Sequence, residues 1–234
     1  IYSFISGSAG RLKPGIYELS PTVSVFTVVK NLQSGPDEDV SILVREGDTL
    51  PEIEARLVQA RVLKKGELVK FPGKSLEGFL FPDTYRFFFN SSPESVVERF
   101  MSNFYRQAVP LLAERCQVSG VKCQDYNTYE LLNLASILEK EVPFHEDRRL
   151  VAGLLYKRLG IGMALQVDAA PWTYDHPGLP PKPIANPGLD AIRAAVNPEK
   201  SDYLYYLSDP VTKKTIFAKT FDEHVQNKFK YLRR

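Results

Sequence analysis

One stretch near the middle of the chain, residues 131–159, constrains the fold more than any other. Its first half places apolar residues at the i, i+3, i+4 and i+7 positions of one helix face, which predicts an amphipathic helix with a buried stripe. The stripe consists of Leu131, Leu134, Ala135, Leu138 and Val142. Such a helix needs a core to pack against, and 234 residues are enough for one or two domains with a core.

Two glutamates lie at the end of this pattern, with Lys140 between them. At about 100° per residue, Glu139 falls on one border of the apolar stripe and Glu141 on the other. A carboxyl group at such a border is partly buried, which raises its pKa and makes it a usable proton donor near neutral pH. The simpler interpretation is that both glutamates are solvated at an exposed helix end, as most helix-surface glutamates are.

The composition is typical of a globular protein, with 44% apolar and 25% charged residues. A net charge of +2 argues against a nucleic-acid binder that depends on a large basic surface. No apolar run approaches the roughly 18 residues needed to span a membrane. Cys116 and Cys123 lack the spacing of a zinc site, so we expect no metal and no cofactor. The two cysteines form either a small disulfide or a reduced pair.

We expect an α+β fold in three parts. Residues 1–38 form a partial N-terminal α+β segment with a helix that Ser24 caps. Residues 39–75 contain a β-rich strand, an EGD turn and a helix capped by Thr49, and this order resembles the LysM-like fold. The unit is either a sugar-binding module or a spacer, since it lacks an aromatic cluster that would stack on a sugar ring. Residues 76–234 form a larger α+β domain, and we expect a groove between it and the smaller unit.

The run from residue 76 to 90 is rich in aromatic side chains around a turn at Pro82 and Asp83. Most of these aromatic residues are expected in the core. Glu77 and Tyr85 are harder to explain as core residues, so both are candidates for lining the groove.

More polar candidates lie in the last third of the chain. Gln166 and Asp168 are separated by one residue in an extended apolar run, so their side chains share one face. The proline-rich segment 171–187 excludes a helix or a central strand, and we expect it to form a wall of the groove. Asn186 opens a turn before the next helix. A β-hairpin and a final helix are expected over residues 203–207 with 215–217 and over 221–232.

Several motifs follow one another in a fixed order: LEGFLFPDTYRF, LASILEKEV, RLGIGMALQVDAA, GLPPKPIANPGLDAIRAAVNP, YLYYLSD and FAKTFDEHVQN. Together they resemble the YceG/MltG-like endolytic murein transglycosylases over nearly the whole chain. The resemblance implies a LysM-like unit before the catalytic domain. It also implies one N-terminal helix in the bacterial cytoplasmic membrane, with this domain on the outer side. The sequence begins without methionine and shows no such helix, so we expect a piece of a longer, anchored protein.

The resemblance further implies cleavage of nascent glycan strands between N-acetylmuramic acid and N-acetylglucosamine, which leaves a 1,6-anhydro-muramyl end. The catalytic glutamate of the family falls in the LEKE motif, which places it at Glu141, with Glu139 as the runner-up. One carboxyl group suffices, because it donates a proton to the glycosidic oxygen and then accepts the proton of the attacking C6 hydroxyl.

Other groups are expected to bind the substrate: Glu77, Tyr85, Gln166, Asp168 and Asn186. For Asp168 and Asn186, bracing of a loop by hydrogen bonds is an equal alternative. Two other functions stay open, a hydrolase that pairs Glu141 with Asp168 or Glu77, and a non-catalytic peptidoglycan-binding or scaffold protein. Peptidoglycan glycan strands are the expected partner, with cell-wall synthases as protein partners.

The chain departs from the family in residues 169–177. The family has a longer segment here, with a YNTY-like piece, whereas this chain has only AAPWTYDHP. Either Trp172, Tyr174 and His176 substitute for the missing residues, or one wall of the groove is absent.

Overall fold

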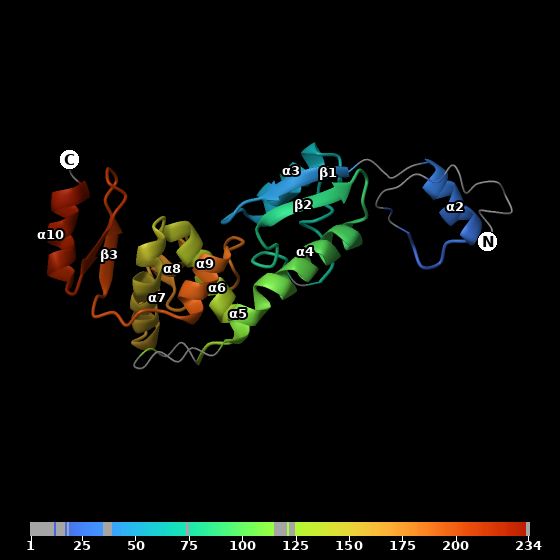
Figure 1. Ribbon diagram of the computed structural model, residues 1–234. Coiled ribbons are helices and arrows are strands. Elements are labelled where there is room, and N and C mark those ends of the chain that lie inside the picture. The colour runs from blue at the N-terminus through green and yellow to red at the C-terminus, as the bar shows by residue number, and fades with distance from the viewer. Residues whose placement is uncertain are drawn as a thin grey trace.

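The computed structural model describes residues 12, 17, 19–34, 39–73, 75–114, 121 and 125–232. Within them the chain forms nine helices and two small antiparallel sheets, an α+β fold as predicted. Figure 1 shows these elements along one long axis, from α2 (Val25–Ser34) to α10 (Phe221–Leu232). Cys116 and Cys123 lie outside the described residues, so their pairing stays a prediction.

The first hydrophobic core is built on a two-stranded sheet. Strand β1 (Asp39–Val44) pairs antiparallel with β2 (Asp83–Phe88). Helix α3 (Leu50–Gln59) begins at Thr49, where a capping box satisfies the free amides of its first turn. Helix α4 (Pro93–Gln107) covers the same core with the apolar side chains of its first half. Each strand of the sheet therefore depends on a partner that is distant in sequence, with paired residues from Val44 and Asp83 to Asp39 and Phe88.

The division between the two cores does not fall at residues 75 and 76, where the sequence places it. Strand β2 lies beyond that boundary and completes the sheet of the first core. Along α4, Phe100 packs in the first core and Phe104 in the second, so this helix links the two. The likeness of residues 39–75 to LysM is not confirmed.

The second core surrounds α6 (Thr128–Glu141), the helix predicted to be amphipathic. Its residues from Leu131 to Leu138 are all buried, because α5 (Val109–Ala113), α7 (His145–Gly160) and α9 (Leu189–Val196) pack around it. The buried residues include two polar ones that donate hydrogen bonds inside the protein, Asn133 to the Pro180 carbonyl and Ser136 to the Asn133 carbonyl. None of the helices in the described ranges is long and apolar enough to cross a membrane.

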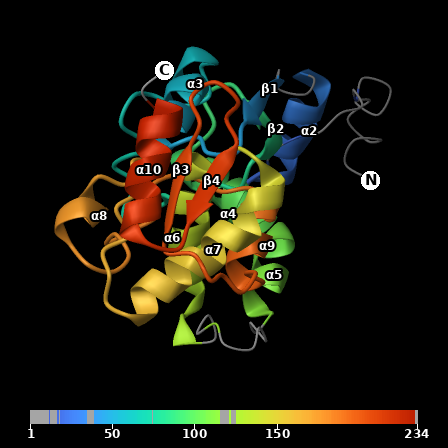
Figure 2. The same ribbon diagram turned by 90° about the vertical axis from the view of Figure 1, so that its left-hand side faces the viewer.

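The C-terminal part is a hairpin with one helix packed on it. Strands β3 (Tyr205–Ser208) and β4 (Thr215–Ala218) pair antiparallel, and α10 contacts both. Figure 2 shows this unit in front of α7, at the end of the molecule far from α2. The proline-rich segment differs from its prediction, because it contains one helical turn, α8 (Trp172–Asp175). A turn fits there because no proline follows Pro171 until residue 177.

A buried asparagine joins the two cores. The side-chain nitrogen Nδ2 of Asn186 donates to the backbone carbonyl oxygen of Asp48 and to Oε1 of Glu77, both at 2.9 Å. Its side-chain oxygen accepts from the backbone amides of Gly78 at 2.9 Å and Leu80 at 2.8 Å. One side chain thus satisfies four groups from segments more than 100 residues away in sequence.

We predict that Asn186→Ala lowers the free energy of unfolding by about 2–4 kcal/mol, because it leaves several buried polar groups without partners. Denaturant unfolding followed by circular dichroism measures the change. Asn197→Ala, at an exposed position after α9, is the matched control and should change stability by less than about 0.5 kcal/mol. Equal losses in the two variants would contradict a joining role for Asn186.

Candidate active site

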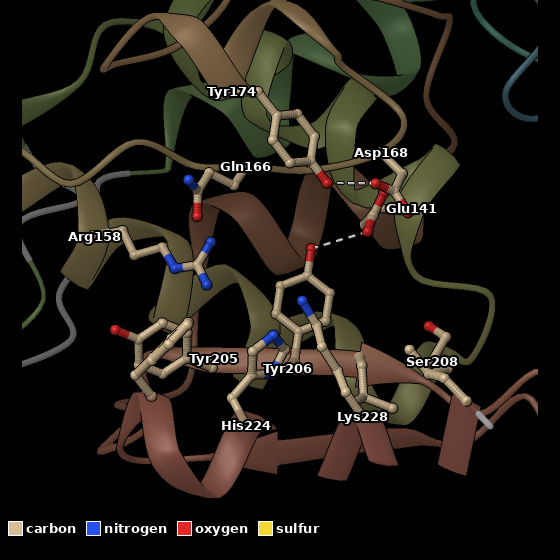
Figure 3. Close-up of a pocket in the computed structure, with 13 residues that line it drawn as sticks. Glu141, Arg158, Gln166, Asp168, Tyr174, Tyr205, Tyr206, Ser208, His224 and Lys228 are labelled. Carbon is tan, nitrogen blue, oxygen red and sulfur yellow. Dashed lines mark hydrogen bonds between the residues drawn. The ribbon is translucent and has the colours of Figure 1, made fainter. Parts of the chain in front are cut away.

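A pocket of about 390 Å³ separates the second core from the C-terminal hairpin and helix (Figure 3). Its wall includes Glu141 at the end of α6, Asp168 in the loop after α7, and Tyr206 on β3. The groove predicted between the small unit and the larger domain is therefore not where Glu141 lies. The junction of the cores does hold a cavity, but its lining is largely apolar and includes Phe71 and Phe79.

The Glu141 carboxylate is held by one donor on each oxygen. The backbone amide of Ala169 donates to Oε2 and the Tyr206 hydroxyl to Oε1, each at 3.1 Å. Burial raises the pKa of Glu141 and the nearby charge of Asp168 raises it further, while the two hydrogen bonds lower it. Burial prevails, so the pKa stays above the ordinary glutamate value. This carboxyl group therefore keeps its proton to a higher pH than an exposed glutamate.

The loop after α7 carries two more predicted residues into the pocket, Gln166 and Asp168. Gln166 has a left-handed backbone with φ +49°, so a turn rather than a strand directs these side chains. The buried Thr173 fixes that turn, because its carbonyl accepts from the Gln166 amide and its hydroxyl accepts from the Val167 amide. The Tyr174 hydroxyl donates to Asp168 at 2.5 Å, a bond that raises the pKa of Tyr174 to about 12.

Sequence analysis missed two residues that shape this pocket, Arg158 and Tyr206. Arg158 is only 4% exposed and donates from Nε to the Leu204 carbonyl at 2.7 Å, and from Nη1 to the Leu165 carbonyl. It thereby fixes both the hairpin and the loop that carries Gln166 against α7. Both residues lie within the family motifs named in the sequence analysis. Their place in those motifs was the signal that could have identified them.

Glu139 points away from the pocket. Its side chain is 5% exposed, and its Oε1 accepts from Nη2 of Arg148 at 2.7 Å. Its Oε2 accepts from the backbone amide of Gly188 at 3.0 Å. The prediction that the two glutamates occupy opposite borders of the helix agrees with this arrangement. Glu139 has an internal structural role here, and Glu141 faces the pocket.

Three of the expected substrate-binding residues lie inside the protein, away from this pocket: Glu77, Tyr85 and Asn186. Glu77 accepts from the backbone amide of Leu50, and Asn186 joins the two cores as described above. The Tyr85 hydroxyl donates to the Phe81 carbonyl, and burial raises its pKa to about 12. The prediction that Glu77 and Tyr85 line a groove is corrected, because each is at most 8% exposed. For Asn186 the hydrogen bonds agree with the alternative expectation, bracing of a loop.

The fold and the pocket define an α+β protein with a partly buried carboxyl group at an open site. The profile of the YceG-like family matches residues 1–171 and 170–230, so the chain belongs to that family. A crystal structure described as a YceG-like protein from Listeria monocytogenes superposes with a TM-score of 0.68 and 29% identity. That match covers 97% of this chain and 88% of the other.

Two curated relatives carry the name endolytic murein transglycosylase. The protein from Bacillus subtilis strain 168 is 28% identical over 280 residues, which cover 99% of this chain and 76% of the relative. The protein from Streptococcus pneumoniae strain D39 is 28% identical over 281 residues, which cover 92% of this chain and 50% of the relative. The chain thus spans half the length of the pneumococcal relative.

The departure from the family at residues 169–177 coincides with a break in the profile match, whose two pieces meet at residues 170 and 171. Both alignments to the curated relatives are also longer than the 234 residues of this chain. In the shortened segment, Trp172 stacks on His176 with ring centroids 4.4 Å apart, while Tyr174 lines the pocket. Only the tyrosine of these three therefore contributes to the pocket wall.

We predict that two substitutions move the pKa of Glu141 in opposite directions. Tyr206→Phe removes a hydrogen bond to the carboxylate, so the pKa should rise. Asp168→Asn removes a neighbouring negative charge, so the pKa should fall. The ¹³C chemical shift of the Glu141 carboxyl, followed by NMR against pH, reports both changes. Shifts of the same sign would contradict the arrangement described here.

Proposed function

We propose that this protein is a peptidoglycan lytic transglycosylase that cleaves glycan strands between N-acetylmuramic acid and N-acetylglucosamine. The observation that carries the proposal is Glu141, a partly buried carboxyl with a raised pKa at an open pocket, inside the LEKE motif. The names of the curated relatives support the same activity.

In the first step, protonated Glu141 donates its proton to the glycosidic oxygen while the bond from that oxygen to C1 of the muramyl residue breaks. Positive charge develops at C1 and the ring oxygen. Asp168, on the same wall of the pocket, stabilises this charge electrostatically. In the second step, the Glu141 carboxylate accepts the proton of the C6 hydroxyl as O6 bonds to C1. The product is a 1,6-anhydro ring, and no water is consumed.

The two donors on Glu141 suit a group that changes its charge during the reaction. After the first step the carboxylate is ionised in a partly buried site, and the Ala169 amide and the Tyr206 hydroxyl then stabilise it. Burial also raises the pKa of Tyr206 well above its ordinary value, so this hydroxyl remains a donor across the physiological range. The same contacts hold the carboxyl group in one orientation toward the pocket.

A second candidate is a hydrolase with two acids. Asp168 is close enough to Glu141 that its charge raises the pKa of Glu141, whereas Glu77 is buried inside the protein. The pair of Glu141 with Asp168 is therefore favoured over the pair of Glu141 with Glu77. Asp168 would then activate a water molecule, and the product would have a reducing end instead of an anhydro end. Mass analysis of the ends of digested glycan separates the two reactions.

The proposed substrate places the reaction on the outer side of the bacterial cytoplasmic membrane, where glycan strands are assembled into the wall. We include in the proposal an anchor in that membrane and a partnership with cell-wall synthases, as the family resemblance implies. Fractionation of cells that produce the full-length protein, with protease protection, tests its location. Crosslinking to synthases in intact cells tests the partnership.

We predict that Glu141→Gln lowers the formation of anhydro ends by about 10²-fold or more, because the amide keeps the size of the side chain but has no acidic proton. Digestion of uncross-linked glycan strands, followed by mass spectrometry of the ends, measures the loss. The variant should bind the strands and unfold at a temperature close to that of the unaltered protein. Full activity in Glu141→Gln would exclude the single-glutamate mechanism.

Glu139→Gln is expected to act on stability instead. It removes the buried charge that pairs with Arg148, which keeps Asp190 as a second carboxylate partner, so the free energy of unfolding should fall by about 1–3 kcal/mol. Below the unfolding temperature, the activity per folded molecule should remain within a few-fold of the unaltered protein. A stable but inactive Glu139→Gln variant would instead assign the catalytic role to Glu139.

A further inference from the structure

The pocket has two chemically different sides. Glu141 and Asp168 lie together on one side of it, and Arg158 lies across from them, with His224 and Lys228 of α10 below (Figure 3). Figure 3 shows the Arg158 guanidinium extending from α7 toward the space into which His224 and Lys228 rise from α10. The mechanism proposed above uses only the acidic side.

Arg158 is a buried charge without a carboxylate partner. It is 4% exposed, and it forms no ion pair with any Asp or Glu in the described ranges. Two of its nitrogens donate to backbone carbonyls, which carry no full charge. A buried guanidinium without a counter-ion is costly, so a site that keeps one and opens it to a pocket is suited to an anion from outside.

The neighbouring groups are held in place around Arg158. The Tyr205 ring lies 5.6 Å from the guanidinium and stacks on the His224 ring at 5.3 Å, so it orients both. Nδ1 of His224 is buried and has no hydrogen-bond partner within the described part of the chain. The exposed Lys228 on the next turn of α10 adds a second full positive charge that no described carboxylate pairs. These groups form a pre-organised donor set that lacks its acceptor.

We propose that this part of the pocket, the subsite formed by the cations Arg158 and Lys228 with the His224 imidazole, binds a carboxylate carried by the glycan strand. The inference rests on the proposed function, because muramyl residues carry a lactyl group whose carboxyl is either free or extended by a peptide that bears carboxylates. N-acetylglucosamine has no such group. The subsite would therefore tell the two sugars of the strand apart and fix which bond faces Glu141.

The test measures binding in the Glu141→Gln background, so that no cleavage interferes. The ligands are uncross-linked peptide-bearing glycan strands, and the same strands with all carboxylates capped as amides by carbodiimide and ammonia. Isothermal titration calorimetry at low ionic strength gives Kd for each. We expect capping to weaken binding by about fivefold, the upper end of the range for a partly exposed ion pair.

Lys228→Gln should weaken binding of the uncapped strands by about fivefold and leave binding of the capped strands unchanged. Its matched control is Lys230→Gln, an exposed lysine of the same helix outside the pocket lining, which should change neither value. An Arg158→Lys variant that stays folded should lose the same preference for uncapped strands. If the Glu141→Gln protein, with Lys228 unaltered, bound capped and uncapped strands with equal Kd values, the proposed subsite would be overturned.

Strands stripped of peptide by an amidase distinguish the source of the carboxylate. In the peptide-bearing strands the lactyl carboxyl is bound in an amide, so a capping effect there comes from the peptide carboxylates. Retained, Lys228-dependent binding of the stripped strands shows that a free lactyl carboxylate also occupies the subsite, and its loss restricts the subsite to the peptide carboxylates. The outcome is separate from the proposed function. Cleavage to anhydro ends without an effect of capping would overturn the subsite alone. A capping effect that depends on Lys228, without anhydro ends, would support the subsite and count against the transglycosylase.

Discussion

The buried ion pair between Glu139 and Arg148 determines where the central helix ends and therefore where the candidate acid lies. Arg148 also donates from Nε to the carbonyl oxygen of Val142, the residue that follows α6. Glu139 in turn accepts from the Gly188 amide at the start of α9. The last turn of α6 is thus held by α7 and α9 at once, and the opposite border of that turn presents Glu141 to the pocket. Such a pair adds little net stability because both charges are desolvated, but it fixes geometry.

Local sequence pattern was sufficient for most helices and for the difference between the two glutamates. The period of the apolar residues located α6, and the helical wheel put Glu139 and Glu141 on different borders. The pattern could not reveal that α4 links both cores, because its stripe is continuous from Val96 to Phe104. Nor could it show that β1 pairs with β2, since strand pairing across 40 residues is decided by tertiary packing.

The errors at the site have one physical origin. Glu77, Tyr85 and Asn186 were expected in a groove because polar side chains in an apolar region suggest a ligand. In the structure their partners are backbone groups and other buried side chains, and a buried polar group that is internally satisfied has the same sequence signature as one that binds substrate. Arg158 was missed for the converse reason: a basic residue near a helix end is usually solvated, and only the tertiary fold shows that it is buried.

The separation of charge within the pocket reconciles two requirements of the proposed reaction. A general acid needs a raised pKa, and any cation beside it would lower that pKa by favouring the carboxylate. The recognition of an anionic strand, in contrast, needs cations. The charge that acts on Glu141 is that of Asp168, which raises its pKa. The pKa of His224 is lowered first by burial and then by the charges of Lys228 and Arg158. The pocket can therefore bind a carboxylate on one side while the acid on the other side keeps its proton.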